Sequence, residues 1–272
     1  MQSFDLSIIV VAYAQQELLH ATLESVIQHT HAITYELIVV DNASVELHRA
    51  ALQLAFPSVR QVRNARNVGY AAANNRGIRL SRGRYVALLN PDTLLHSDAL
   101  SALVRWLDDH ADVGAIGPQL QQPDGDPQPY SHGALPTPSY LIRRLWSHQR
   151  GAYLHDWQAE EPTDTDWIAG TCLVARRTAI DEIGPLDERF FLYFEDVDWG
   201  VRLRRAGWRV VFLPAVVITH VGGASVGSDA SPFYDRSLVQ LYGKYYGGFA
   251  AGGVWLALRV YRLIQQARRR IR

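Results

Sequence analysis

The chain has 272 residues, of which 48% are hydrophobic and 20% are charged, and its single cysteine is Cys172. This composition is that of a globular protein and excludes collagen-like, coiled-coil and disordered chains. One cysteine excludes an internal disulfide framework and a cysteine-rich zinc site, and it fits a reducing compartment. A chain of this length buries most of its apolar surface in one large core, to which a short segment can be appended.

The formal net charge of zero hides an uneven distribution of charge. After Asp235 the sequence has eight basic residues and no acidic one, which leaves residues 1–235 with 19 basic and 27 acidic side chains, a net charge of −8. The tail therefore suits an anionic surface, and the acidic body has carboxylates available for chemistry. No Lys or Arg precedes Arg49 in the sequence, so we expect the apolar run 6–12 to be a strand and not a signal peptide.

Short apolar runs alternate with helical patterns over the first hundred residues. The continuous apolar runs are typical of parallel strands that helices cover on both faces. The fold class predicted is therefore α/β, with a mostly parallel, Rossmann-like sheet. Strands are predicted at 7–13, 35–41, 59–64 and 85–90, and helices around 18–27, at 70–80 and at 98–110.

The second half of the chain has a weaker pattern. A proline-rich stretch at 119–138, with a turn at 123–125, is expected to be a long mobile loop of the kind that closes over ligands. A strand is predicted at 167–175, a helix at 195–206, and a strand at 208–213 that precedes His220.

Polar side chains follow three of the predicted strands. In sheets of this kind ligands bind beyond the carboxyl ends of the strands, where Tyr13, Asp41, Asn90 and Asp92 stand. The ring of Tyr13 and the carboxylate of Asp41 suit a nucleobase, and Asp92 suits a hard divalent cation that shares its coordination with a diphosphate. The plainer interpretation is a core aromatic for Tyr13 and turn-forming Asx residues for Asp41 and Asp92.

Three acids follow a mostly aromatic run at 190–194. At the start of a helix, the carboxylates of Glu195, Asp196 and Asp198 are stabilised by the helix N-terminus, and one beside an aromatic wall can serve as a general base. We favour this role for Asp196, whereas helix capping or a solvated face explains Asp198 as well. His220 is either a packed core histidine or a ligand, and Gly222 beyond it permits close approach of the backbone to a bound molecule.

With these motifs in order, the chain resembles the family-2 glycosyltransferases of the GT-A fold, in particular their bacterial rhamnosyltransferase-like branch. The resemblance covers most of the chain, in the family's order, at 7–13, 39–44, 66–77, 83–93, 170–176, 190–208 and 220–223. It implies that the nucleotide-sugar is bound by Ala12, Tyr13, Asp41, Arg66, Asn67 and Asn90.

The same resemblance implies roles for the remaining site residues. Asp92, the acid of the Asn-Pro-Asp segment, holds Mg²⁺ or Mn²⁺ together with His220. Asp196 is the catalytic base, and Glu195, Asp198 and Trp167 bind the acceptor.

Two positions depart from the family's pattern. Asn90 replaces the first acid of the family's Asp-x-Asp motif, so we expect no direct bond from Asn90 to the metal. Ala14 stands where the family usually has an asparagine, which removes one side-chain contact to the nucleotide.

The function that the resemblance implies is inverting transfer of a sugar from a nucleoside-diphosphate sugar, with dTDP-rhamnose as the donor of this branch. The acceptor expected is a saccharide or lipid-linked saccharide of cell-surface polysaccharide synthesis. Two alternatives stay open: a saccharide-binding or assembly module without turnover, and a sugar-phosphate nucleotidyltransferase. The nucleotidyltransferase requires a glycine-rich, cationic loop after the first strand. In this chain that place is taken by residues 14–17, which include neither a glycine nor a cationic side chain. The sequence lacks a G-x-G-x-x-G motif there, which disfavours a dinucleotide-dependent oxidoreductase.

Two units are expected along the chain: a catalytic domain at 1–225, with a nucleotide-binding half at 1–118 and an acceptor half at 119–225, and a basic helical segment at 226–272. The uncharged stretch 247–258 is shorter than the roughly 20 residues that span a bilayer. Apolar residues at helical spacing beside a polybasic end favour a helix that lies on the inner face of the bacterial cell membrane. Packing on the chain's own domain or on a dimer partner is the alternative, and we expect no nucleic acid partner.

Overall fold

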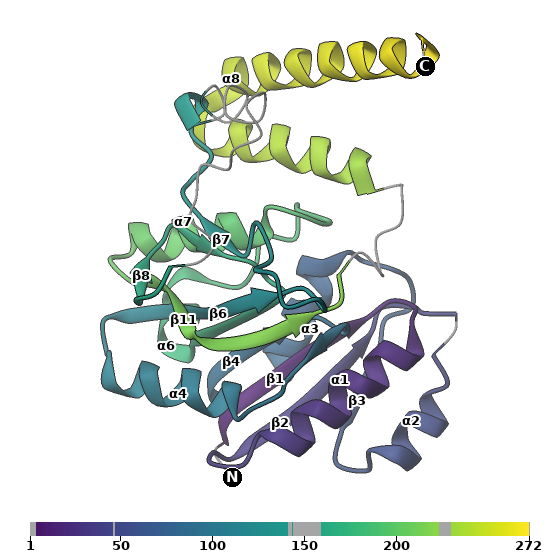
Figure 1. Cartoon of the computed structure of the whole chain (residues 1–272), viewed down its shortest axis with the longest axis vertical. Coiled ribbons are helices and arrows are strands. Elements are labelled where there is room, and N and C mark those ends of the chain that lie inside the picture. Colours follow the sequence, from purple (N-terminus) through teal and green to yellow (C-terminus); the bar gives the residue numbers. More distant parts are fainter. Residues whose placement is uncertain (1–3, 46, 141–142, 144–158, 223–229, 272) are drawn as a thin grey trace.

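The computed structural model describes residues 4–45, 47–140, 143, 159–222 and 230–271 (Figure 1). Its strands are β1 Phe4–Ala12, β2 Tyr35–Asp41, β3 Arg60–Arg63, β4 Gly83–Leu89, β5 Thr93–Leu94, β6 Val113–Gln121, β7 His132–Gly133, β8 Thr163–Asp164, β9 Trp167–Ile168, β10 Cys172–Arg176 and β11 Arg209–His220. Its helices are α1 Gln16–His29, α2 Arg49–Ala55, α3 Tyr70–Leu80, α4 Ala99–Asp109, α6 Arg177–Ile183, α7 Glu195–Arg205 and α8 Ala230–Ile271.

One sheet organises the molecule. Its strands follow the order β3-β2-β1-β4-β10-β6-β11-β5, and β8 pairs with β11 at one edge. The four strands from β3 to β4 are parallel, as are β6 and β11, whereas β10 is antiparallel to both of its neighbours. The predicted α/β fold with a mostly parallel sheet is confirmed.

Helices cover both faces of the sheet because its central strands are apolar on both sides. In β1, Leu6, Ile8 and Val10 point to the face that α1, α2 and α4 cover. Ile9 and Val11 point to the opposite face, which α3, α6 and α7 cover. Successive side chains of a strand alternate between faces, so an unbroken apolar run places hydrophobic groups in both cores.

The elements of the second half differ from those predicted. The segment predicted as one strand at 167–175 forms two strands, because the chain turns at 169–171. Strand β9 pairs with β7 in a small sheet, whereas β10 belongs to the main sheet. Strand β11 is longer than predicted and continues to His220 past an irregularity between Leu213 and Val217. The first residues of the proline-rich stretch belong to β6, and the turn predicted at 123–125 is present.

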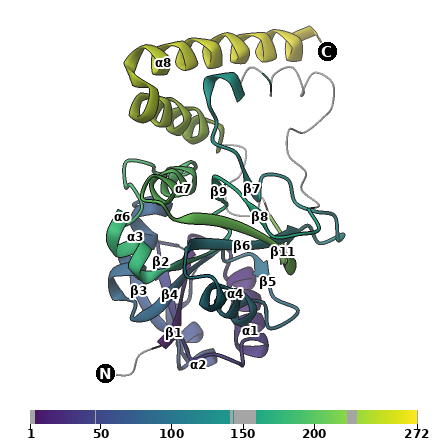
Figure 2. The ribbon, with the colours of Figure 1, turned by 90° about the vertical axis from the view of Figure 1, so that its left-hand side faces the viewer.

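Helix α8 is a hairpin with two arms, drawn in yellow-green and yellow at one end of the molecule (Figures 1 and 2). The inner arm is residues 230–246 and the outer arm is residues 248–271. They are joined at Gly247, whose φ of 85° and ψ of 173° are non-helical. Arg262 of the outer arm donates from Nε to Oδ2 of Asp235 on the inner arm over 2.9 Å. No helix among the described residues is long and apolar enough to cross a membrane.

The inner arm is fastened to α7. Leu241 packs in a cluster with Phe190 and Val197, and Lys244 reaches Asp198 on α7 with an Nζ–Oδ1 distance of 2.5 Å. Tyr245 donates to the same carboxylate over 2.6 Å. The boundary predicted at 225–226 lies outside the described residues, but the packing shows that the inner arm lies against α7.

Candidate active site

A cavity of about 840 Å³ opens beyond the carboxyl ends of the parallel strands. Residues following β1, β2 and β4 line one part of it, and the start of α7 and the inner arm of α8 line another. Its size is in the range of small-molecule sites. Asp92 and Asp196, the two acids that carry the predicted chemistry, both line it.

Asp92 and His220 face each other at the end of β11. Oδ1 of Asp92 lies 3.1 Å from Nε2 of His220, and both residues are largely buried. Nδ1 of His220 lies 2.7 Å from Oε1 of Gln128, which can only accept, so Nδ1 is the donor. Nε2 is the ring nitrogen that faces the carboxylate of Asp92.

This pair fits a divalent cation. A metal-binding histidine usually donates from one ring nitrogen to an oxygen acceptor and binds the metal through the other, which in His220 is the nitrogen beside the Asp92 carboxylate. No group of three or more His, Cys, Asp or Glu side chains gathers to bind a metal within the described part of the chain. A cation held by Asp92 and His220 would therefore complete its coordination with ligand oxygens and water, as Mg²⁺ does with phosphates.

Of the residues predicted to bind the nucleotide-sugar, Tyr13, Asn67 and Asn90 line the cavity. Asn42, which lies in the segment 39–44 that resembles the family, also lines the cavity and orders this part of it. Its Nδ2 donates to Oδ1 of Asn67 over 2.8 Å, and its Oδ1 accepts from Nδ2 of Asn64 over 2.9 Å. The amides thereby hold one another in a fixed orientation.

Three residues predicted to bind the nucleotide-sugar are not among the described residues that line the cavity: Ala12, Asp41 and Arg66. Ala12 and Asp41 are buried, and Arg66 is exposed. Oδ1 of Asp41 accepts from the backbone N–H of Ser44 over 2.8 Å, and Oδ2 lies 3.5 Å from the guanidinium of Arg63. Asp41 thus stabilises the turn after β2, which is the plainer interpretation given for it above.

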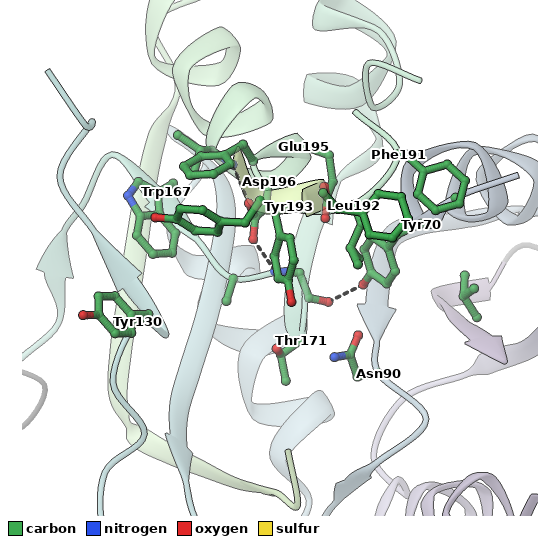
Figure 3. Close-up of a pocket in the computed structure, with 18 of the residues that line it drawn as sticks. Tyr70, Asn90, Tyr130, Trp167, Thr171, Phe191, Leu192, Tyr193, Glu195 and Asp196 are labelled. Carbon is green, nitrogen blue, oxygen red and sulfur yellow. Dashed lines mark hydrogen bonds between the residues drawn. The ribbon is translucent and has the colours of Figure 1, made fainter. Parts of the chain in front are cut away.

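Asp196 lies at the first turn of α7 with its carboxylate facing the cavity. Oδ2 accepts from the backbone N–H of Gly170 over 3.0 Å, and Oδ1 accepts from that of Val197 over 2.8 Å. Tyr70 donates to the carbonyl of the same Gly170 over 2.6 Å, and the bonds to Gly170 are drawn in Figure 3. A Cβ at position 170 would stand 3.1 Å from the Tyr70 ring, so the close contact favours glycine.

The adjacent carboxyls of Glu195 and Asp196 have different surroundings. Burial and the nearby charge of Asp196 raise the pKa of Glu195 well above 4.5, and Oε2 of Glu195 has no hydrogen-bond partner among the described residues. Burial also raises the pKa of Asp196 above 3.8, but the N–H groups of Gly170 and Val197 oppose this by stabilising the anion. Asp196 therefore ionises first, and Glu195 holds its proton longer.

This difference predicts how Glu195→Gln affects stability. The pKa of Glu195 is higher in the folded than in the unfolded chain. The contribution of this side chain to the free energy of unfolding is therefore greatest at low pH, and it is lost as the pH rises above 4.5 through the raised pKa. Glutamine cannot ionise. We expect the variant to melt at least about 2 °C above wild type near pH 8 and to lose this advantage near pH 4.

Differential scanning fluorimetry across this pH range measures the effect. Glu24→Gln is the control, because it removes the same charge from an exposed site on α1. An equal gain in Tm from both variants, or the same gain at all pH values, would contradict the assignment of a buried proton to Glu195.

Of the predicted acceptor residues, Glu195 and Trp167 line the cavity, whereas Asp198 faces α8. Asp198 is 0% exposed and is bound by Arg202, Lys244 and Tyr245. These contacts fit neither helix capping nor a solvated face: Asp198 pairs with Arg202 within α7 and fastens α8 to α7. Trp167 donates from Nε1 to the carbonyl of Ala134 over 3.0 Å, which fixes the plane of its ring.

Several lining residues were not predicted as functional. They are Asn42, Tyr70, Gln128, Tyr130, Gly170, Tyr193, Phe233 and Tyr234. Gln128 and His220 are 92 positions apart, and Tyr70 and Gly170 are 100 apart, so no local pattern joins them. The aromatic run before Glu195 was the one signal that pointed to some of this wall.

The chain belongs to glycosyl transferase family 2, whose family model matches residues 7–184. Among its relatives, N-acetylglucosaminyl-diphospho-decaprenol L-rhamnosyltransferase of Mycobacterium tuberculosis is 28% identical over 265 residues, which cover 87% of this chain and 85% of the relative. Rhamnosyltransferase WbbL of Escherichia coli is 23% identical over 219 residues, which cover 78% of this chain and 82% of the relative.

Solved structures of glycosyltransferases confirm the GT-A fold. Mannosyltransferase PcManGT of Pyrobaculum calidifontis, in complex with GDP-Man and Mn²⁺, matches with a TM-score of 0.61 at 19% identity over 91% of this chain and 65% of that one. TarS of S. aureus matches with a TM-score of 0.60 at 15% identity over 88% of this chain and 40% of that one. The chain thus spans less than two thirds of the length of these structures.

Proposed function

We propose that this glycosyltransferase is an inverting, metal-dependent enzyme that transfers rhamnose from dTDP-rhamnose to a hydroxyl of a saccharide or lipid-linked saccharide. The observation that carries this proposal is the shared cavity, which has the Asp92–His220 pair at one place and the Asp196 carboxylate at another. A divalent cation bound by that pair, Mg²⁺ or Mn²⁺, would offset the charge of the diphosphate leaving group.

The proposed reaction is a single displacement. The carboxylate of Asp196 takes the proton of the acceptor hydroxyl, and the hydroxyl oxygen attacks the anomeric carbon on the face opposite the nucleoside diphosphate. The bond from this carbon to the acceptor oxygen forms as its bond to the diphosphate oxygen breaks, and the electron pair leaves with the diphosphate. One displacement inverts the configuration at the anomeric carbon.

The donor side of this proposal involves Tyr13, Asn67 and Asn90, which line the cavity together with the Asn42 amide. The choice of rhamnose is supported by the names of two relatives, both of them rhamnosyltransferases. The choice of a lipid-linked acceptor is supported by the mycobacterial relative, which is named for a decaprenol-linked substrate.

Donor hydrolysis tests the proposal without knowledge of the acceptor. Purified protein is screened by thermal shift against dTDP, UDP and GDP with Mn²⁺, and the corresponding donors are then assayed for slow release of nucleoside diphosphate. We expect dTDP to stabilise most, and EDTA to abolish hydrolysis. Stabilisation by UDP or GDP alone would contradict the donor, and EDTA-resistant hydrolysis would contradict the metal.

We also propose that the outer arm of α8 lies on an anionic membrane surface. Its exposed apolar side chains include Phe249, Trp255, Leu256 and Leu263, and the sequence beyond Asp235 has only basic charges. An amphipathic helix of this composition binds the interface of a bilayer through its apolar face and its cations. Such contact would bring the cavity close to a lipid-linked acceptor.

Cosedimentation with vesicles tests this membrane contact. We expect the full chain to bind vesicles of phosphatidylglycerol and phosphatidylcholine, and a chain lacking 247–272 to stay in solution. Replacing Arg268, Arg269 and Arg270 by Gln removes three cations at about 1 kcal/mol each, so binding should weaken by roughly 100-fold. Equal binding by all three proteins, or a stable dimer of the full chain that ignores vesicles, would refute the contact.

A further inference from the structure

Four consecutive residues before α7 face the same cavity. Phe191, Leu192, Tyr193 and Phe194 all line it, while Phe190 is fully buried in the core. Successive side chains of an extended strand point to opposite sides, so a regular strand cannot direct four in a row into one space. The chain must curl at this point to do so.

The curl consists of two left-handed residues in succession. Tyr193 has a φ of 70° and Phe194 a φ of 67°, and Tyr130, which also lines the cavity, has a φ of 62°. Bulky side chains rarely adopt this conformation, and such outliers persist only where surrounding contacts enforce them. Three aromatic residues of one cavity share it, which indicates that the placement of their rings matters.

The inner arm of α8 supplies contacts that enforce the curl. Tyr234 meets the ring of Tyr193 edge-on at 5.8 Å between centroids, and it meets Phe194 at 5.0 Å. Phe233 stacks on Phe191 at 5.0 Å, and Ser237 donates to the carbonyl of Leu192 over 2.8 Å. The rings are therefore held in place before any ligand binds.

The charge of the cavity restricts what these rings can bind. The acidic residues among those described as lining it are Asp92, Glu195 and Asp196, and Lys and Arg are absent from this set. A carboxylated or phosphorylated group on the acceptor side would meet the Asp196 carboxylate, and no Lys or Arg among the described lining residues would offset the two charges. In the close-up, Tyr130 and Trp167 lie on one side of Asp196, and Tyr70 and Phe191 lie on the other (Figure 3).

We infer that Tyr193, with Trp167 and Tyr130, forms a platform for one uncharged pyranose ring of the acceptor. This inference rests on the proposed function and adds the substrate class. Aromatic faces bind the apolar face of a sugar ring, and the Nε1 of Trp167 is already engaged with Ala134, which leaves its ring face for such contact. The ring so held presents its hydroxyl to Asp196.

Two variants of Tyr193 test the platform. Glycine adopts a φ near 70° without steric cost, so Tyr193→Gly keeps the path of the chain and removes only the ring. Tyr193→Phe keeps the ring and removes the hydroxyl. The probes are methyl N-acetyl-β-glucosaminide and methyl β-glucuronide, whose binding is measured by saturation-transfer NMR with Mg²⁺ and the nucleoside diphosphate that stabilises the protein most.

We expect wild type and Tyr193→Phe to bind the neutral glycoside, and Tyr193→Gly to bind it about tenfold more weakly. The glucuronide should bind weakly to all three. Donor hydrolysis is measured in wild type, as the separate readout of the proposed function. Loss of hydrolysis in wild type would refute the proposed function itself, whereas normal hydrolysis with unchanged glycoside binding in Tyr193→Gly would refute the platform alone.

Two further outcomes would also overturn the inference. One is preferential binding of the glucuronide. The other is tighter binding of decyl glycosides than of methyl glycosides. That result would make the aromatic wall a site for the lipid part of the acceptor.

Discussion

Asp196→Asn should reduce sugar transfer by about 10²–10⁴-fold, the usual contribution of a general base. The amide keeps the shape of the side chain but cannot take the acceptor proton. The two oxygens of Asp196 accept from the backbone N–H groups of Gly170 and Val197, and asparagine keeps only one of these bonds because its Nδ2 cannot accept. Steady-state transfer assays measure the loss, and nucleotide binding should be unchanged.

A control for this variant is Asp181→Asn, an exposed acid on α6. It removes one negative charge without touching the cavity, so its transfer rate should equal that of wild type. Near-normal turnover of Asp196→Asn would show that another group takes the proton. Loss of nucleotide binding along with turnover would show that the variant disturbs the donor side instead.

Asp92→Asn should lower transfer by roughly three orders of magnitude, since electrostatic stabilisation of a leaving group by a bound metal contributes several kcal/mol. The substitution removes the carboxylate that faces Nε2 of His220. The variant should also lose the part of nucleotide binding that depends on Mn²⁺, which isothermal titration with and without the metal measures. His220→Gln should cause a smaller loss, because Asp92 remains.

The two readouts separate chemistry from binding. If Asp92→Asn retains metal-dependent nucleotide binding, the acid is not a ligand of the cation. If wild-type transfer is unaffected by EDTA, the pair of Asp92 and His220 has a structural role and the metal proposal fails.

Much of the fold was predictable because its strands are short apolar runs bounded by turns. The predicted limits of β2 and α3 match the structure, and those of β1, β4, α4 and α7 differ by a few residues at most. Strand β6 was missed because Gly114, Gly117 and Pro118 interrupt its apolar pattern. At Gly117 a Cβ would stand 2.1 Å from Ile168, so tertiary packing selects the glycine that hides the strand from the sequence.

The site was predictable where chemistry follows strand ends. Tyr13, Asn90 and Asp92 were expected at the mouth of the sheet, and they line its cavity. Residues that depend on distant partners were not predictable. Asn42 is oriented by Asn64 and Asn67, which follow β3, and Gln128 orients His220 from a stretch expected to be a mobile loop that closes over ligands.

The arrangement of α8 has a consequence for how this protein can be shortened. Phe233 and Tyr234 of the inner arm form one wall of the cavity, and Lys244 neutralises the buried Asp198 two residues after Asp196. A chain that stops before α8 would leave Asp198 with one cation fewer and its aromatic neighbours exposed to water. Recombinant fragments intended for biochemistry should therefore end after the inner arm, near Gly247, and not at the predicted domain limit.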